Sequence, residues 1–192
     1  MPTRLFLAVT PLAFAALLLL HPTGSGAPAD AVIPNADRWL TVHLGMVAFL
    51  PLMAAVVWLF VRDLDSRSAT VARWSLAPFV ALYGAYEAAL GIASGVLGQS
   101  GHADAINALF DSPITGDPGV LGTAGGLAWI TAAVAAAIAA RGAGASRTAT
   151  ALIATGGLMA MHVPPFGQVA LVSLAAGMAL ARRAPRAVPV AA

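Results

Sequence analysis

The chain has 192 residues, of which 59% are hydrophobic and 9% charged, and its mean hydropathy is +0.85. A soluble domain carries about 25% charged residues, so this composition excludes an ordinary soluble protein and predicts that lipid surrounds most of the chain. The chain contains no cysteine, which excludes disulfides, iron–sulfur clusters, thiolate zinc sites and cysteine nucleophiles. Its arginines stand in small groups at segment ends, a pattern that does not indicate nucleic-acid binding.

Long apolar segments separated by polar loops predict an all-α, polytopic transmembrane helix bundle, because a helix needs about 20 apolar residues to cross a bilayer. The last apolar stretch, Thr148–Ala181, is too long for one crossing. Pro164-Pro165 divides it, since consecutive prolines remove two backbone donors and end a helix. We therefore predict six spans, of which the last two are short and form a hairpin at Pro164-Pro165. The spans are Leu5–Leu20, Trp39–Val61, Trp74–Leu97, Val120–Ala140, Thr148–Val163 and Gln168–Ala181.

The arginines support six crossings. With the N-terminus in the cytoplasm, nine of the ten arginines fall on the cytoplasmic side and only Arg38 lies outside. A single span over the last apolar stretch would instead place Arg182, Arg183 and Arg186 outside. We therefore expect a multi-pass protein of the bacterial cytoplasmic membrane with both termini in the cytoplasm. The lysine-free, alanine-rich composition resembles that of GC-rich bacterial genomes.

The start of the chain permits a second interpretation. Met1–Arg4, the apolar Leu5–Leu20 and the following "GAPAD" also resemble a secretory signal with a cleavage site before Asp30. Cleavage would leave five spans, and we favour retention of the segment. Residues 1–192 are expected to form one integral membrane domain, in which the outer-loop stretch "HADAINALF" predicts a short amphipathic helix at the interface.

All four histidines fall on the outer side of this topology. His43 lies about one turn inside the second span, and His162 closes the fifth span. Ionisable residues at membrane depth are usually functional, so these two are candidate ligands. His21 and His102 lie in polar outer loops, where we expect plain surface residues.

Methionines accompany both candidate histidines. Met46 follows His43 by three residues on nearly the same helix face, and Met161 directly precedes His162. Imidazole nitrogen and thioether sulfur suit copper or haem iron. We therefore predict that His43 and His162 converge on one ligand, with Met46 or Met161 as a further donor. The alternative is that the methionines only fill the apolar interior.

Glu87 is an unusual residue for a membrane span, because this ionisable side chain lies near the middle of the third span. A carboxylate there costs about 3 kcal/mol on insertion scales, so it is expected to be protonated, paired or in a wet cavity. Tyr83 lies one turn away on the same face, and we include both residues among those that contact a cofactor. The alternative is a carboxylic acid that hydrogen-bonds a neighbouring helix.

Three functions are compatible with these patterns. The first is a membrane protein that holds haem or copper at a histidine and methionine site near the outer face. The second is a transporter or a membrane-embedded capture subunit for a small solute, with Glu87 as the coupling carboxylate; in size and helix count the chain resembles the capture subunits of energy-coupling-factor importers. The third is a structural subunit of a larger membrane complex or homo-oligomer. The sequence identifies no catalytic residue, and hydrolysis ranks last because no nucleophile–base pair stands out.

Overall fold

The computed structural model describes residues 2–181, and every regular element in that part of the chain is helical. The elements are α1 (Pro2–Leu18), α2 (Pro28–Val32), η1 (Ile33–Asn35), α3 (Ala36–Val61), α4 (Arg67–Pro78), η2 (Phe79–Tyr83), α5 (Gly84–Tyr86), η3 (Glu87–Ile92), α6 (Ala93–Gln99), α7 (Ala103–Asp111), α8 (Val120–Gly142), α9 (Arg147–Thr155), η4 (Gly156–Ala160) and α10 (Phe166–Ala181). The all-helical class predicted from the sequence is confirmed. The C-terminal arginines used in the topology prediction lie outside the described residues.

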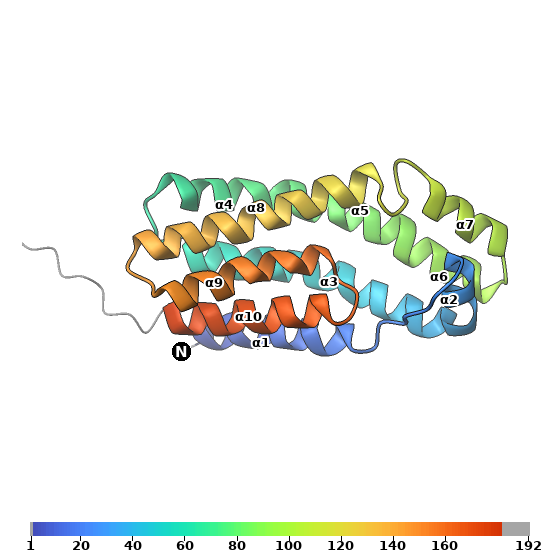
Figure 1. The fold of residues 1–192 in the computed structure, drawn as a ribbon, viewed down its shortest axis with the longest axis horizontal. Helices are drawn as coiled ribbons and strands as arrows, with labels where there is room; N and C mark the ends of the chain where they lie inside the picture. The colour runs from blue at the N-terminus through green and yellow to red at the C-terminus, as the bar shows by residue number, and fades with distance from the viewer. Residues whose placement is uncertain (1, 182–192) are drawn as a thin grey trace, which may run out of the picture.

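The long helices close into a ring. Helix α1 packs against α3, α3 against α4, α4 against α8, α8 against α9, and α9 against α10, which returns to α1. Figure 1 shows the first and last helices of the chain side by side along one edge of the bundle. The loop between α1 and α2 and the loop between η4 and α10 are far apart in the sequence. Because α1 and α10 are neighbours, the two loops lie in the same region of the molecule.

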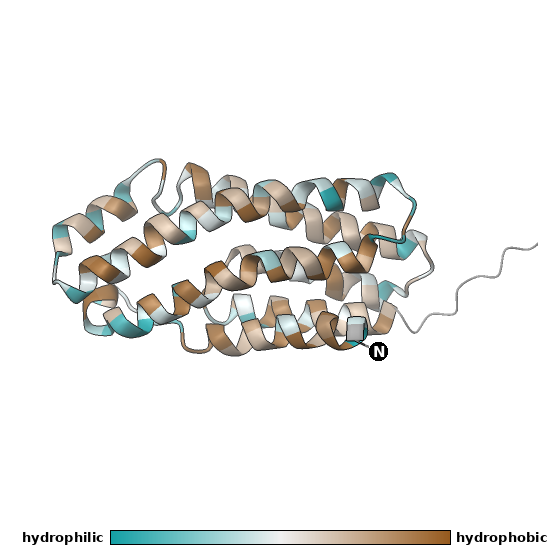
Figure 2. Cartoon of the chain, turned by 180° about the vertical axis from the view of Figure 1, so that it is seen from behind, coloured by the Kyte–Doolittle hydropathy of each residue, from teal (hydrophilic) through white to brown (hydrophobic). Residues whose placement is uncertain are grey.

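Three helices are long and apolar enough to cross a membrane, namely the continuous helical stretches Pro28–Val61 and Arg67–Gln99 and the single helix Val120–Gly142. Two more apolar helices, Thr3–Leu18 and Phe166–Ala181, are shorter. Figure 2 shows hydrophobic residues along the whole length of the bundle helices. Large hydrophobic side chains that are exposed include Trp58, Leu127 and Val172. Many exposed large hydrophobic side chains on the outside of a helix bundle are typical of contact with lipid.

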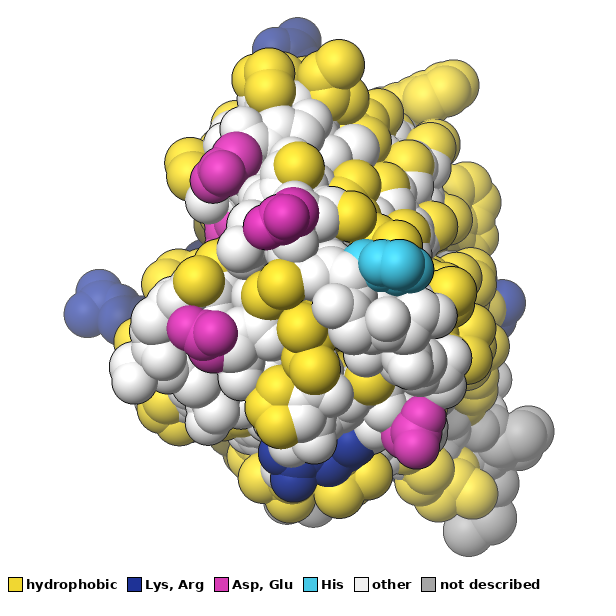
Figure 3. All heavy atoms as spheres, turned by 90° about the vertical axis from the view of Figure 1, so that its right-hand side faces the viewer, with side chains coloured by type: hydrophobic (Ala, Val, Ile, Leu, Met, Phe, Trp, Pro, Cys, Tyr) yellow, Lys and Arg dark blue, Asp and Glu magenta, His cyan; other side chains and the backbone are white. Residues whose placement is uncertain are grey.

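The two ends of the molecule differ. In Figure 1 the α3–α4 and α8–α9 connections lie at the same end as the N-terminus; Arg62 follows α3 there, and Arg141 is in the last turn of α8. The opposite end is built from α2, α6 and α7, beyond the ends of the short helices α1 and α10. Figure 3 views this end and shows acidic side chains and a histidine on its surface. Helix α7 is strongly amphipathic and buries Ile106, as expected for the "HADAINALF" stretch.

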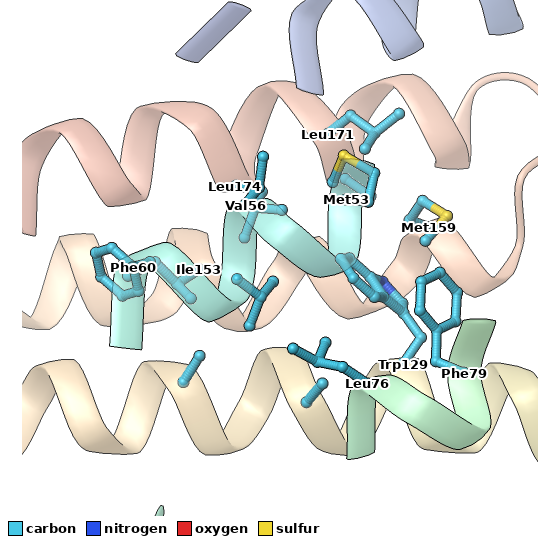
Figure 4. Packing of buried hydrophobic residues seen from close by; sticks show 14 of the residues in the cluster. Met53, Val56, Phe60, Leu76, Phe79, Trp129, Ile153, Met159, Leu171 and Leu174 are labelled. Carbon is cyan, nitrogen blue, oxygen red and sulfur yellow. The ribbon is translucent and has the colours of Figure 1, made fainter. Parts of the chain in front are cut away.

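The predicted hairpin at Pro164-Pro165 is observed, although the first of its two helices is more irregular than expected. Helix α9 ends at Thr155 and continues as the 3-10 turn η4, and α10 begins at Phe166. At this transition the Gly156 carbonyl accepts a hydrogen bond of 2.9 Å from the Trp129 indole. Figure 4 shows Trp129 beside Phe79 and near Met159 in the core, so α8 and η4 are fixed to one another by packing and by this bond.

The third predicted span forms a continuous helical stretch in which π-helical turns interrupt the α-helix. Pro78 ends α4, and two π-helical segments, η2 and η3, follow on either side of the short α5. Proline lacks the backbone donor that an α-helix needs, and π-helical turns are frequent at functional sites. The irregular segment contains Tyr83 and Glu87, and it positions both side chains toward the centre of the ring.

Candidate metal centre

Three histidines from three separate parts of the chain converge inside the bundle. His21 lies in the loop after α1, His43 in α3 and His162 just after η4. The ring centroid of His21 is 5.1 Å from that of His43 and 5.2 Å from that of His162, and the His43–His162 distance is 6.1 Å. One ligand atom from each residue lies within 4.8 Å of the other two, so the group could hold a metal ion. The structure thus brings together His43 and His162, as the sequence predicts.

His21 corrects the prediction of a surface residue. Its exposed fraction is 7%, because the loop after α1 folds inward between α3 and the start of α10 rather than outward into water. Burial lowers the pKa of His21, while a hydrogen bond to the Pro22 carbonyl opposes this shift. His102, in contrast, is exposed as expected. A histidine directly after a short apolar helix was the available signal, but its inward turn depends on tertiary packing.

The backbone fixes the tautomers of two rings. Nδ1 of His21 lies 2.7 Å from the Pro22 carbonyl oxygen, and Nδ1 of His43 lies 2.8 Å from the Trp39 carbonyl oxygen. A carbonyl only accepts, so each Nδ1 carries the proton and each Nε2 of the neutral ring keeps a free lone pair. The Nε2 of His21 is buried without a hydrogen-bond partner among the described residues. Metal-binding histidines usually have this arrangement, in which the second ring nitrogen donates to a carbonyl.

Tyr83 fixes the third ring in the same way. Its hydroxyl donates to the Ala160 carbonyl at 2.9 Å and lies 2.9 Å from Nδ1 of His162. A hydroxyl has one proton, so Tyr83 accepts from Nδ1–H and leaves the Nε2 lone pair of His162 free. Neutral imidazole with a free nitrogen is the form that binds metals.

Glu87 lies beside this group and is 1% exposed. Its Oε2 is 3.8 Å from Nε2 of His43, and its Oε1 is 3.7 Å from Nδ1 of His162. Oε1 has no hydrogen-bond partner among the residues that the structure describes. A buried carboxylate without a full set of partners is costly, and a cation held by the histidines would offset that cost. Because α3 begins at Ala36, His43 lies deeper than predicted and reaches the level of Glu87.

We expect Glu87→Gln to lower the affinity for a divalent metal ion about tenfold while leaving the thermal stability of the metal-free protein nearly unchanged. Glutamine keeps the shape of the side chain but removes a negative charge beside the imidazoles, and one pair of charges in a partly shielded site is worth about 1–3 kcal/mol. Titration with a chromophoric competitor chelator measures the change. Equal affinities in the two proteins would show that Glu87 serves packing alone.

The two predicted methionine donors have different environments. Met46 is fully buried in the hydrophobic core, whereas Met161 has an exposed fraction of 50%. The candidate centre contains three imidazoles and one carboxylate, and Met46 and Met161 remain predicted donors. Met159 also belongs to the core.

Trp39 and Gly91 support the His43 ring and were not identified from the sequence as part of the site. The Trp39 ring stacks on His43 at a centroid distance of 4.6 Å, and its indole donates to the Gly91 carbonyl at 2.9 Å. A β-carbon at Gly91 would lie 2.6 Å from Cγ of His43. In the sequence, Trp39 has the position of an interfacial aromatic residue, and Gly91 has the position of a glycine that lets helices pack closely. Neither position indicates a ligand site.

No protein-family model, curated protein or solved structure matches this chain. The class of protein is described by its structure alone. It is an all-helical protein with three helices long and apolar enough to cross a membrane and with a histidine cluster that could bind a metal.

Proposed function

We propose that the protein is a membrane metalloprotein that binds one first-row transition-metal ion through Nε2 of His21, His43 and His162. The observation that carries the proposal is the common tautomer of the three rings, whose Nδ1 atoms all have acceptors and whose Nε2 atoms all remain free. A metal–nitrogen bond is about 2.0–2.1 Å long, so two ligand atoms on one tetrahedral ion lie about 3.4 Å apart, and the three ligand atoms would approach one another by up to about 1.4 Å from their separations of up to 4.8 Å. Glu87 then supplies negative charge beside the ion.

Copper is the ion we expect to bind most tightly. Imidazole suits copper, zinc, iron and nickel, and divalent copper heads the affinity order among the divalent ions. An ion fits better than a haem, because the three rings are mutually 5.1–6.1 Å apart and the third imidazole occupies the space that a porphyrin between the other two would need. A three-histidine ion also keeps an open coordination position, as in redox and catalytic centres.

Metal analysis of the protein purified in detergent tests this proposal. After loading with copper, zinc or cobalt and removal of free ion, we expect one ion per chain in the wild type. His102→Ala is the matched control, because this exposed histidine lies outside the cluster and its loss should leave the stoichiometry unchanged. Loss of the ion in this control, or no bound ion in the wild type, contradicts the proposal. A Soret band in the purified protein would instead assign the site to haem.

Transport and scaffolding are the alternatives that the same experiment addresses. If no metal binds, Glu87 becomes the main remaining candidate for function, as a coupling carboxylate in a small-solute transporter or capture subunit. If Glu87→Gln also leaves every property unchanged, a structural subunit of a larger membrane complex or homo-oligomer is the better interpretation.

We further propose that all six members of the ring cross the bacterial cytoplasmic membrane, with the arginine-bearing end in the cytoplasm and α1 retained. The packing of α1 and α10 against each other supports this, and so does the burial of Phe14 and Leu18 of α1 in the core. The metal centre then lies at the outer ends of the short helices.

Reporter fusions measure this topology. A cytoplasmic reporter inserted at Gly144, in the α8–α9 connection, should be active, and a periplasmic reporter at Gly101, between α6 and α7, should be active. The reason is the arginine bias of the first end, because short loops rich in arginine stay in the cytoplasm. The reverse pattern of activity would overturn the orientation, and activity of the same reporter at both sites would overturn the crossing of α8.

A further inference from the structure

A second feature of the site is a pocket on the other side of Tyr83 from the histidines. The cavity measures about 250 Å³ and opens at the surface between α8 and the segment that contains η2 and α5. Its lining includes Tyr83, Tyr86, Asp117, Thr123, Leu127 and Ile130. A cavity of about 150 Å³ holds a benzene ring, so this one has room for a ring with a small substituent.

Glycines of α8 give the pocket its shape. A β-carbon at Gly125 would lie 2.8 Å from Cα of Tyr83, and one at Gly122 would lie 2.9 Å from the Tyr86 ring. Helix α8 can therefore approach this segment closely, and the two phenol rings form part of the pocket wall. The phenol rings are themselves buried, with exposed fractions of 2% for Tyr83 and 8% for Tyr86.

The pocket has one charged residue and an apolar side. Asp117 is exposed and forms no ion pair with any described residue. No lining residue is basic. Leu127 and Ile130 are exposed on the flank that we assign to lipid. A carboxylate without an ion-pair partner favours a cation, and an organic ammonium group also suits the apolar side of the pocket.

We propose that this pocket binds an organic ammonium group carried on a small apolar body, and that Tyr83 forms the wall between this ligand and the metal centre. The Tyr83 ring lines the pocket while its hydroxyl holds the His162 tautomer, so a ligand pressed against the ring changes the environment of the metal. The effect of the ligand on the metal rests on the proposed metal function. Binding of the ammonium ligand in the pocket does not depend on that function. The ammonium group belongs either to a free amphiphile or to a lipid headgroup.

Calorimetric titration of the metal-free protein with benzyltrimethylammonium tests the pocket. This probe cannot coordinate a metal, and dodecyl maltoside micelles contain no competing ammonium group. We expect Asp117→Asn to weaken binding about fivefold, the upper range for an exposed ion pair, and Thr123→Trp to abolish binding by filling the mouth. Asp104→Asn is the matched control, since this acid is at the same end of the molecule, in α7, but does not line the pocket.

Absence of binding in the wild type, or equal binding in the wild type and Asp117→Asn, overturns the proposal. Added phosphatidylcholine that competes with the probe in an Asp117-dependent way assigns the site to a lipid headgroup, and absence of competition assigns it to a free amphiphile. Both of these results support an ammonium site.

The influence on the metal has its own measurement. With cobalt or copper bound, the probe should shift the visible spectrum of the wild type. Tyr83→Phe keeps the aromatic wall but loses the hydroxyl, so it should still bind the probe without the spectral shift. If metal does not bind but the probe does, the proposed function fails and the ammonium site stands. If metal binds and the probe does not, the pocket proposal fails alone. A shift that persists in Tyr83→Phe overturns the role of Tyr83 as the shared wall.

Discussion

Replacing His43 by alanine is expected to lower the affinity for copper or zinc by more than about 100-fold. Loss of a group that only orients a ligand costs about 10–100-fold, and loss of one of three ligands exceeds that range. His21→Ala and His162→Ala should have effects of the same size, because each ring contributes one nitrogen to the same group. Competition with a chelator of known affinity, followed by metal analysis, measures the change.

His102→Ala is again the control for these variants, since it removes an imidazole without touching the cluster. The melting temperature of each metal-free protein separates loss of ligand from loss of fold. Wild-type affinity in any of the three cluster variants, with the fold intact, would remove that histidine from the proposed set.

Gly91→Ala is expected to destabilise the protein by about 2 kcal/mol, the usual cost of forcing an extra carbon into a well-packed interior. The added β-carbon would lie 2.6 Å from Cγ of His43, and this ring cannot retreat easily because Trp39 stacks on its face. We also expect weaker metal binding, since His43 has to move away from the other two imidazoles. Thermal or denaturant unfolding in detergent, and the same chelator competition, measure the two effects.

Gly142→Ala is the matched control, because a β-carbon on this last glycine of α8 would point into open space and should change stability by less than about 0.5 kcal/mol. A double variant adds a sharper test. In the His43→Ala background the ring is gone and only the 2.9 Å contact with Cβ of residue 43 remains, so Gly91→Ala should cost clearly less stability than in the wild type. An equal cost in the two backgrounds would show that the His43 ring is not the source of the effect.

The helices were largely predictable from the sequence because apolar length and proline position determine them locally. The hairpin at Pro164-Pro165 and the helix at Ala103–Asp111 follow from such local signals. The π-helical turns in η2 and η3 do not, because their sequence "FVALYGAYEAALGI" is compatible with an ordinary helix. Their geometry depends on the contacts of the segment with α3 and α8.

The candidate site was predictable only in part. The one-sided distribution of histidines indicated where a site would lie, and the structure does bring His43 and His162 together. The sequence could not identify His21 as their neighbour, because its loop position is typical of a solvated residue. It predicted Met46 or Met161 as a further donor, and the structure buries Met46 in the core and leaves Met161 half exposed.

The closed order of the helices has a consequence for how the protein is made. His21 follows the first helix, whereas His162 precedes the last helix, and α1 and α10 are neighbours. A nascent chain that has inserted only α1, α3 and the α4–α6 stretch holds two of the three imidazoles. The third arrives when the final hairpin docks against α1. If the chain binds the proposed metal ion, loading would follow completion of synthesis, and an ion that binds only the closed ring would link the first and last helices and slow their separation.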